Sequence, residues 1–329
     1  MARGMLYLPA LIAGAVLMAC VAAVLAVSEK AEATFPGKNG KIAYSGEDGP
    51  KGDFEIYTIN AGGGGRVQLT GNTTDDGEPS YSPSSKRIAY SGFDGKDWEI
   101  YTINTGGGGR VQLTHNTTFE GAPSYSPSGK KIVYSGEDGP KGDFEIYTIN
   151  AGGGGRVQLT HNTTDDYGSS YSPNGKKIAY AGEDGPKGDF EIYTINAGGG
   201  GRFNVTDDNA NDFGPSYSPS GRKIAYYGRA AADFEIYTIN TGGGGRVQLT
   251  HNTTFDEHPS YSPNGKKIAY AGEDGKDWEI YTINAGGGSR FNVTDNTTDD
   301  FEPSWGSRHD DDDNDDDDND DDDNDDDDK

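Results

Sequence analysis

The stretch Ile56-Tyr57-Thr58 decides the fold of this chain, because it recurs five more times at nearly even spacing. The further copies begin at Ile100, Ile146, Ile192, Ile236 and Ile280. The steps between copies are 44, 46, 46, 44 and 44 residues. A period in the forties with short strand-like segments is typical of propeller blades, each of about four strands. The six copies therefore predict six blades.

Each repeat divides into four short β-type segments separated by turn residues. In one repeat these segments are Ser80–Ser82, Ile88–Tyr90, Glu99–Asn104 and Val111–Thr114. Pro-Ser-Gly or Pro-Asn-Gly sequences follow the first segment, and glycine runs precede the last one. The glycine runs lack the Gly-Lys-Ser/Thr ending of a phosphate-binding loop, so they are interpreted as hairpin connections.

The two ends of the chain complete the strand count. The first segment, Ile42–Tyr44, is of the second type, and the last, Ser304-Trp305, is of the first type. The three N-terminal segments and the single C-terminal one must then share a blade, which closes the ring and leaves no open sheet edge between the first and last blades. The prediction is an all-β, six-bladed propeller of four-stranded antiparallel blades, spanning residues 35–306.

One repeat shows a family resemblance. Residues 123–132 read Pro-Ser-Tyr-Ser-Pro-Ser-Gly-Lys-Lys-Ile, residues 143–150 read Asp-Phe-Glu-Ile-Tyr-Thr-Ile-Asn, and Leu159-Thr160 follows. This pattern resembles the TolB-type (WD-like) propeller repeat, and tandem copies of it cover roughly residues 35–306. The resemblance implies the same six-bladed fold. One departure is that the usual Asp of the Ser-Pro-Asp-Gly turn is Ser or Asn here, as at Ser128.

Charge is distributed unevenly along the chain. The net charge is −26, of which residues 310–329 contribute −15 through 16 Asp and one Lys, leaving −11 for the rest. An acidic body with an acidic tail argues against nucleic-acid binding, which needs clustered Lys and Arg. Cations and basic partners are favoured instead. Residues 309–329 are expected to form a disordered tail through self-repulsion.

The N-terminal residues predict export. Arg3, an apolar run from Met5 to Val27 and the sequence Ala31-Glu32-Ala33 are typical of a secretory signal peptide over residues 1–33, with cleavage after Ala33. The run is also long enough for an uncleaved membrane anchor. A third alternative is lipidation at Cys20, which ends a lipobox-like sequence. Each alternative places the propeller in the periplasm, on the cell surface or outside the cell.

Six acids recur at one repeat position and are the candidate binding residues. Each lies three residues before the Pro, or Ser169, of the first segment; they are Asp76, Glu120, Asp166, Asp212, Asp256 and Asp300. Placed at one mouth of the central channel, they would form a carboxylate ring that binds a cation such as Ca²⁺ or a basic peptide. Alternatively, each acid caps its own turn through a hydrogen bond to the backbone.

Asn-x-Thr sequences also recur, and a turn role explains them sufficiently. They begin at Asn72, Asn116, Asn162, Asn204, Asn252 and Asn296.

Positions where the repeats differ are the other candidates for function. Arg229 lies in the one basic, apolar replacement of an acidic loop, Trp98 and Trp278 replace Phe, and His258 is a single departure near the predicted mouth. Aromatic and Arg residues are favoured interface anchors. Drift after duplication is the alternative explanation.

No catalytic residues are predicted, and no metal ligands apart from the carboxylate ring. The chain has no Gly-x-Ser-x-Gly sequence and no set of Ser, His and Asp that fits a triad. The expected function is a non-enzymatic, monomeric binding or scaffold module for a basic protein or peptide, at the cell envelope or outside it. A protein that binds divalent cations or glycans through its acidic mouth and tail is the second hypothesis. A metal-dependent polysaccharide lyase is the third.

Overall fold

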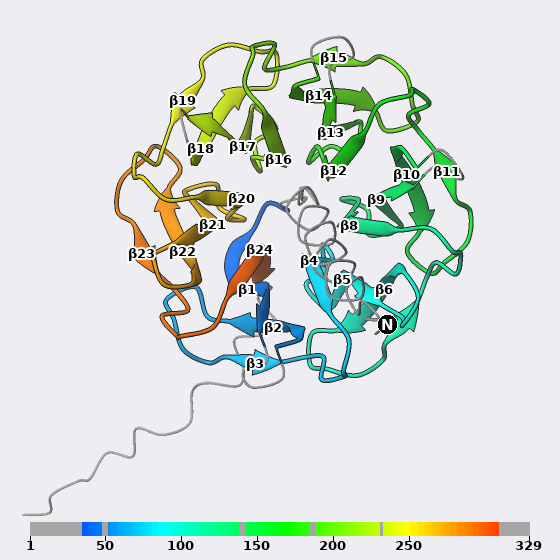
Figure 1. Cartoon of the computed structure of the whole chain (residues 1–329), viewed down its shortest axis with the longest axis horizontal. Helices are drawn as coiled ribbons and strands as arrows, with labels where there is room; N and C mark the ends of the chain where they lie inside the picture. The colour runs from blue at the N-terminus through cyan, green and yellow to red at the C-terminus, as the bar shows by residue number, and fades with distance from the viewer. Residues whose placement is uncertain (1–34, 48–51, 138–141, 184–187, 231–232, 309–329) are drawn as a thin grey trace, which may run out of the picture.

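The structure, a computed structural model, describes residues 35–47, 52–137, 142–183, 188–230 and 233–308. Within them, 24 strands form six four-stranded antiparallel sheets around a central axis (Figure 1). The predicted six-bladed all-β propeller is therefore confirmed. No helix long and apolar enough to cross a membrane occurs in these residues. The predicted leader, residues 1–33, and the tail, residues 309–329, lie outside them.

Each blade places one strand beside the axis and a two-residue strand at the rim (Figure 1). The inner strands are β4 (Asp76–Tyr81), β8 (Glu120–Tyr125), β12 (Asp166–Tyr171), β16 (Asp212–Tyr217), β20 (Asp256–Tyr261) and β24 (Asp300–Arg308). The second strands are β1 (Lys38–Glu47), β5 (Arg87–Phe93), β9 (Lys131–Glu137), β13 (Lys177–Glu183), β17 (Lys223–Ala230) and β21 (Lys267–Glu273). The third strands are β2 (Phe54–Ile59), β6 (Trp98–Asn104), β10 (Phe144–Asn150), β14 (Phe190–Asn196), β18 (Asp233–Asn240) and β22 (Trp278–Asn284). The rim strands are β3 (Val67–Gln68), β7 (Val111–Gln112), β11 (Val157–Gln158), β15 (Phe203–Asn204), β19 (Val247–Gln248) and β23 (Phe291–Asn292).

Inner strands begin earlier, and rim strands end earlier, than the sequence predicted. β4 starts at Asp76 although it contains Pro79, because the register shift between Gly77 and Ser80 leaves the proline outside the regular pairing. β7 stops after Gln112 because the Thr114 hydroxyl, in place of a backbone group, accepts the Ile100 N–H at 2.8 Å. The side chain thus ends the ladder.

The ring closes through the two ends of the described chain. β24 and β1 are antiparallel neighbours in one sheet of order β24-β1-β2-β3, with Trp305 opposite Ile42. The predicted pairing of the N- and C-terminal strands in one blade is therefore confirmed. The closure pairs β1, which would otherwise be the inner edge of its blade, with β24.

The core lies between neighbouring blades. In each blade both faces of the second and third strands are buried, and Ile56, Ile88 and Ile100 are 0 % exposed. Because both faces are covered, alternate residues need not be polar, and the repeat Glu-Ile-Tyr-Thr-Ile shows no polar–apolar alternation. Tyr residues of the second and third strands stack in pairs, as Tyr90 does on Tyr101 with ring centroids 5.6 Å apart.

Candidate functional site: buried carboxylates at the blade junctions

The six acids predicted as a ring each occupy the first residue of an inner strand, where the chain enters a new blade. All six side chains are enclosed, with 0 % exposure. They are Asp76, Glu120, Asp166, Asp212, Asp256 and Asp300. The structure thus encloses these carboxyl groups within the protein instead of opening them to the channel. Cation binding by a ring of all six stays a prediction.

An asparagine four residues earlier holds the acid in five of the six blades. The Asn72 side-chain amide donates to Asp76 Oδ2 at 2.5 Å, and equivalent bonds join four other pairs. The same Asn72 closes its own turn, since its Oδ1 accepts the Thr74 N–H at 2.7 Å. Asn204 is the exception among the predicted Asn-x-Thr residues, because it lies on β15 and Asp208 occupies the turn position.

A glutamate from the third strand of the preceding blade completes each cluster. Glu55 Oε1 accepts the backbone N–H of Asn72 at 2.7 Å, so two blades are joined through buried polar groups. We call the six acids at the start of the inner strands the ring acids. Each set of one glutamate, the residue four positions before the ring acid and the ring acid itself is called a junction triad. The triads are Glu55–Asn72–Asp76, Glu99–Asn116–Glu120, Glu145–Asn162–Asp166, Glu191–Asp208–Asp212, Glu235–Asn252–Asp256 and Glu279–Asn296–Asp300.

An arginine approaches the acid from the same blade. Arg110 lies over the Tyr101 ring, 4.2 Å from its centroid, and its Nη2 is 3.6 Å from Asp76 Oδ1. The same cation–π contact recurs in all six blades. Burial raises the pKa of Asp76 to about 7, although Arg110 opposes this shift. The arginine therefore compensates the buried carboxyl group only in part.

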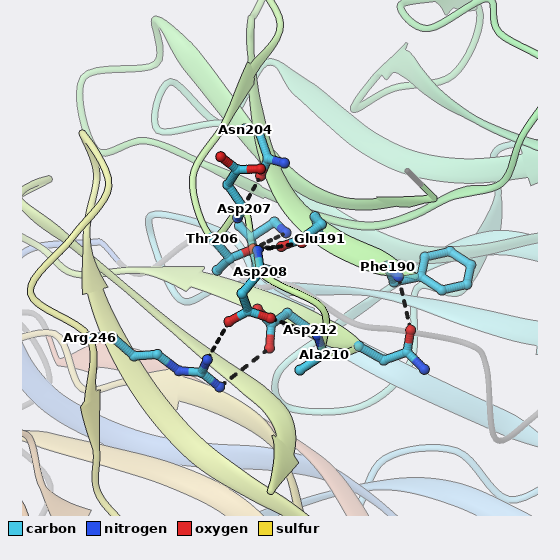
Figure 2. A network of polar contacts seen from close by, with 11 residues as sticks. Phe190, Glu191, Asn204, Thr206, Asp207, Asp208, Ala210, Asp212 and Arg246 are labelled. Carbon is cyan, nitrogen blue, oxygen red and sulfur yellow. Dashed lines mark hydrogen bonds and ion pairs between the residues drawn. The ribbon is translucent and has the colours of Figure 1, made fainter. Parts of the chain in front are cut away.

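The junction between β14 and β16 departs from the other five, because Asp208 stands where they have asparagine (Figure 2). A carboxylate cannot donate the hydrogen bond that Asn supplies to the ring acid. Neither oxygen of the fully buried Asp212 has a hydrogen-bond partner. Arg246 pairs with Asp208 and lies 3.8 Å from Asp212 Oδ1. One guanidinium thus accompanies three clustered carboxyl groups, because a carboxylate oxygen of Glu191 lies within 4.8 Å of those of Asp208 and Asp212.

A glycine pairs with each ring acid, and its lack of a side chain makes room for the cluster. A Cβ at Gly92 would lie 2.6 Å from Asp76 Oδ1 and 3.0 Å from the Tyr101 ring. We therefore expect Gly92→Ala to lower the free energy of unfolding by about 1–3 kcal/mol in urea titrations. Gly106→Ala is the matched control, because a Cβ there meets nothing within 4 Å. Equal stability of the two variants would contradict the crowding.

Two residues after each ring acid, every inner strand adopts a positive φ. The residues are Glu78, Ala122, Gly168, Gly214, His258 and Glu302. The four that are not glycine have φ between 54° and 65°. Non-glycine residues hold this conformation at a cost that their surroundings must offset. The three large side chains, on β20, β24 and β4, belong to consecutive blades.

Two of these side chains tie inner strands together. Glu302 Oε2 accepts the Glu78 N–H at 2.7 Å and the Ser45 hydroxyl at 2.6 Å. Glu78 in turn accepts the Ala122 N–H, and His258 packs edge-on against Tyr227. Sequence reasoning singled out His258 but missed both glutamates. The detectable signal was an acid at a repeat position that the other blades fill with Ala, Gly or His.

The remaining predicted interface residues lie away from the axis. Arg229 is exposed on β17. Trp98 is half-buried and packs between Phe93 and Phe119, and Trp278 packs in the same way. Both tryptophans belong to a nearly continuous belt of rings in contact, formed by Phe54, Phe93, Trp98, Phe119, Phe144, Tyr167, Phe190, Phe213, Phe234, Phe255, Trp278 and Phe301. Packing within this belt accounts for both tryptophans.

The two ends of the blades carry opposite charges. Two kinds of turn lie at one end of the blades. One leads from an inner to a second strand, such as 82–86, and the other from a third to a rim strand, such as 105–110. The two are in contact, because Thr105 N–H donates to Lys86 O. These turns contain no Asp or Glu in any described blade. Each turn from an inner to a second strand ends in a basic residue, and the first residue of the strand that follows is basic as well. The pairs are Lys86 and Arg87, Lys130 and Lys131, Lys176 and Lys177, Arg222 and Lys223, and Lys266 and Lys267. We call this end the basic face.

The opposite end, the acidic face, is built by connections such as 94–97 and 113–119 and by the strand residues beside them. There the N–H of Phe93, the residue before connection 94–97, donates to the carbonyl oxygen of Asp75, the last residue of connection 69–75. The connection from second to third strand therefore begins beside the one that leads from a rim strand to the next inner strand. Exposed acids on this face include Asp94, Asp207, Asp274 and Asp295. The junction triads lie beneath it. Lys96, Lys276 and Arg229 are also exposed there, but acids outnumber them, so the balance of charge differs between the two ends of the axis.

Comparison with known proteins agrees with this architecture. The family model of the TolB beta propeller domain matches residues 39–309. TolB from Acinetobacter baumannii is similar, with 26% identity, a TM-score of 0.75 and coverage of 83% of this chain and 68% of that one. A putative TolB from Agrobacterium tumefaciens is similar in fold, with 18% identity, a TM-score of 0.63 and coverage of 81% and 98%.

An enzyme shares the fold as well. Oligogalacturonate lyase from Vibrio parahaemolyticus has 12% identity, a TM-score of 0.56 and coverage of 81% of this chain and 78% of that one. No curated protein sequence matches the chain. The family match extends over most of the sequence and coincides with the six blades. The chain therefore belongs to the TolB β-propeller domain family.

Proposed function

We propose that this protein is an exported, non-enzymatic binding propeller whose acidic face captures a basic segment of a partner protein. The difference in charge balance between the two faces carries the proposal. A surface of one sign attracts oppositely charged partners and fixes their orientation as they approach. A partner rich in Lys and Arg would meet exposed carboxylates on the acidic face, whereas it would be repelled by the turns of the basic face.

The axis of the propeller supports the same proposal. Glu78 and Glu302 concentrate carboxylates on two neighbouring inner strands and hold a strained backbone conformation there. Strained residues cluster at binding sites because pre-organised geometry is useful to a ligand. A basic peptide that reaches the axis would meet the partly exposed Glu302 and, on the neighbouring blade, His258, whereas Glu78 is buried.

A test is the binding of a Lys- and Arg-rich peptide, measured by calorimetry. The replacement of Asp94, Asp207, Asp274 and Asp295 together by Asn should weaken binding about tenfold, and the loss should shrink at high salt. The matched control replaces three exposed lysines of the basic face, Lys130, Lys176 and Lys266, by Gln. Equal loss in both variants, or no loss in the first, would contradict the proposal.

The tail needs its own control, because residues 310–329 carry a charge of −15 and would attract the same peptide. The measurement is therefore repeated with a chain ending at Arg308. Binding that disappears with the tail would assign the peptide to the tail instead of the acidic face.

Export rests on the leader sequence of residues 1–33, and N-terminal sequencing of the secreted chain would test cleavage after Ala33. We propose a monomer without catalytic activity. A lyase that uses a His cluster at the axis needs several His residues there, and His258 is the one histidine that the described inner strands carry. Turnover of oligogalacturonate by the purified chain would overturn this part.

A further inference from the structure

We propose that the junction triad Glu191–Asp208–Asp212 is a binding site for one divalent cation, with the ligand chemistry of Ca²⁺. One carboxylate oxygen from each residue lies within 4.8 Å of the other two, so a single ion could contact all three (Figure 2). The site bridges two blades, because Glu191 belongs to β14 while Asp208 and Asp212 enter the blade of β16.

The other five junctions show what is unusual here. They place an equivalent glutamate and an equivalent acid, Asp in four junctions and Glu120 in one, around an asparagine amide, which donates a hydrogen bond to the acid. Asp208 replaces that neutral donor by a carboxylate. The substitution adds one negative charge to a buried cluster and removes the hydrogen bond of Asp212. The repeat thus supplies five internal reference sites that differ at this position.

Asp212 is the second observation that indicates a ligand. Its side chain is 0 % exposed, and both of its carboxylate oxygens lack a hydrogen bond. A buried carboxylate without hydrogen bonds costs free energy unless a proton or a cation compensates it. The nearest cationic group, the Arg246 guanidinium, lies 3.8 Å from Oδ1 and is already paired with Asp208.

The presence of Arg246 is not specific to the junction with the additional carboxylate. Arg110 and Arg156 hold the same position beside Asp76 and Glu120, at 3.6 and 3.4 Å, in blades that have asparagine. Arg246 also keeps its cation–π contact with Tyr237, 4.1 Å from the ring centroid. Elsewhere one arginine therefore accompanies the two carboxyl groups of a triad, whereas here one arginine accompanies three.

The donor set matches hard-cation chemistry. Ca²⁺ prefers carboxylate and other oxygen ligands, accepts irregular geometry and completes its shell with water. The Asp208 side chain is 31% exposed, which gives an ion and its waters access from the solvent. The backbone N–H groups of Asp208 and Ala210 already orient Glu191 Oε1 and Asp208 Oδ1, both at 2.7 Å. These bonds pre-organise two of the three ligands.

The experiment compares the full chain with two single variants. Asp208→Asn restores the residue of the other five junctions, so the variant keeps a junction that the fold already tolerates. Asp207→Asn makes the same change of charge at an exposed neighbour outside the triad. Because all three proteins retain the tail, any ion binding by the tail is common to them and cancels in the comparison. Calcium chloride is titrated by calorimetry at neutral pH after removal of metal with a chelator.

We expect the unmodified chain and Asp207→Asn to bind one Ca²⁺ with the same affinity, and Asp208→Asn to lose at least about tenfold in affinity. Ca²⁺ should also raise the urea midpoint of the first two proteins and not that of Asp208→Asn, since a ligand that binds only the folded state stabilises it. Glu191→Gln serves as a second variant with the same expected loss. Equal Ca²⁺ responses in all the proteins, or none in the unmodified chain, would overturn the proposal and leave a shared proton as the compensating charge.

Discussion

Raising the pH from about 5 to about 8 should lower the free energy of unfolding of the propeller by several kcal/mol. Burial raises the pKa of Asp76, Asp166, Asp256 and Asp300 to about 7 and that of Asp212 well above its ordinary value. The unfolded chain exposes these groups to water, where an Asp titrates near 3.9. Each junction therefore takes up a proton on folding in the pH range between the two values.

The direction of the effect follows from this proton uptake. Where the folded state binds more protons than the unfolded state, stability falls as pH rises. The contribution is fully present below about pH 4, where both states are protonated, and it is lost as pH rises through about 7. A curve of stability against pH should therefore decline across the weakly acidic range. Many proteins whose acids are stabilised in the ionised form show the opposite slope.

Urea unfolding curves at a series of pH values would measure this decline. Asp76→Asn removes one titrating group and keeps a polar side chain, so its curve should be flatter than that of the unmodified chain. The control Asp207→Asn removes an exposed acid and should leave the slope unchanged. A stability that is constant, or rises, between pH 5 and 8 would contradict the interpretation of the junctions as buried, partly compensated acids.

The blade count was predictable because it depends only on the period of the repeat, and the closure because it depends only on which segment types begin and end the chain. The ends of the strands were not. Pro79 and Gly77 are unfavourable strand residues, and β4 tolerates them only through a bulge. Thr114 reads as a strand residue, yet its hydroxyl, and not its backbone, completes the edge.

The candidate site was predictable in its members but not in its surroundings. The repeat identified the six acids, because a shared position needs no structural knowledge. Their enclosure depends on Glu55 and its equivalents, which come from the preceding blade. Each of these glutamates lies 21 residues before its acid in the sequence, as Glu55 does before Asp76. The equivalence of Asp208 to the turn asparagine of the other blades was also hidden in the sequence. Asn204, four residues earlier, begins an Asn-x-Thr sequence like theirs and suggests a different alignment of this repeat.

Trp305→Ala should destabilise the propeller by about 3–5 kcal/mol, the usual cost of deleting a buried aromatic side chain. Trp305 is 3% exposed on β24 and stands where the other five inner strands have Tyr. Its indole N–H donates to Gly40 O at 3.2 Å, across the pairing that closes the ring. The loss therefore removes both core volume and a bond of the closure.

A comparison with Tyr125→Ala separates these two contributions. Tyr125 is 2% exposed at the equivalent position of an internal blade, so its deletion leaves a comparable cavity without weakening the contact between β1 and β24. Trp305→Tyr restores the repeat residue and should cost only about 1 kcal/mol, the net value of the indole hydrogen bond. Urea unfolding gives the free energies of all three variants.

Hydrogen exchange distinguishes a local opening from a global one. Amides of β1 and β24 should exchange faster in Trp305→Ala than in Tyr125→Ala at matched overall stability, because β24 is joined to the rest of its blade only through β1. An opened closure also exposes strand edges that can pair with another chain, so Trp305→Ala should associate more readily at high concentration. If both variants exchange alike at β1 and β24, Trp305 contributes only its volume to the core, and the closure is held by the strand pairing itself.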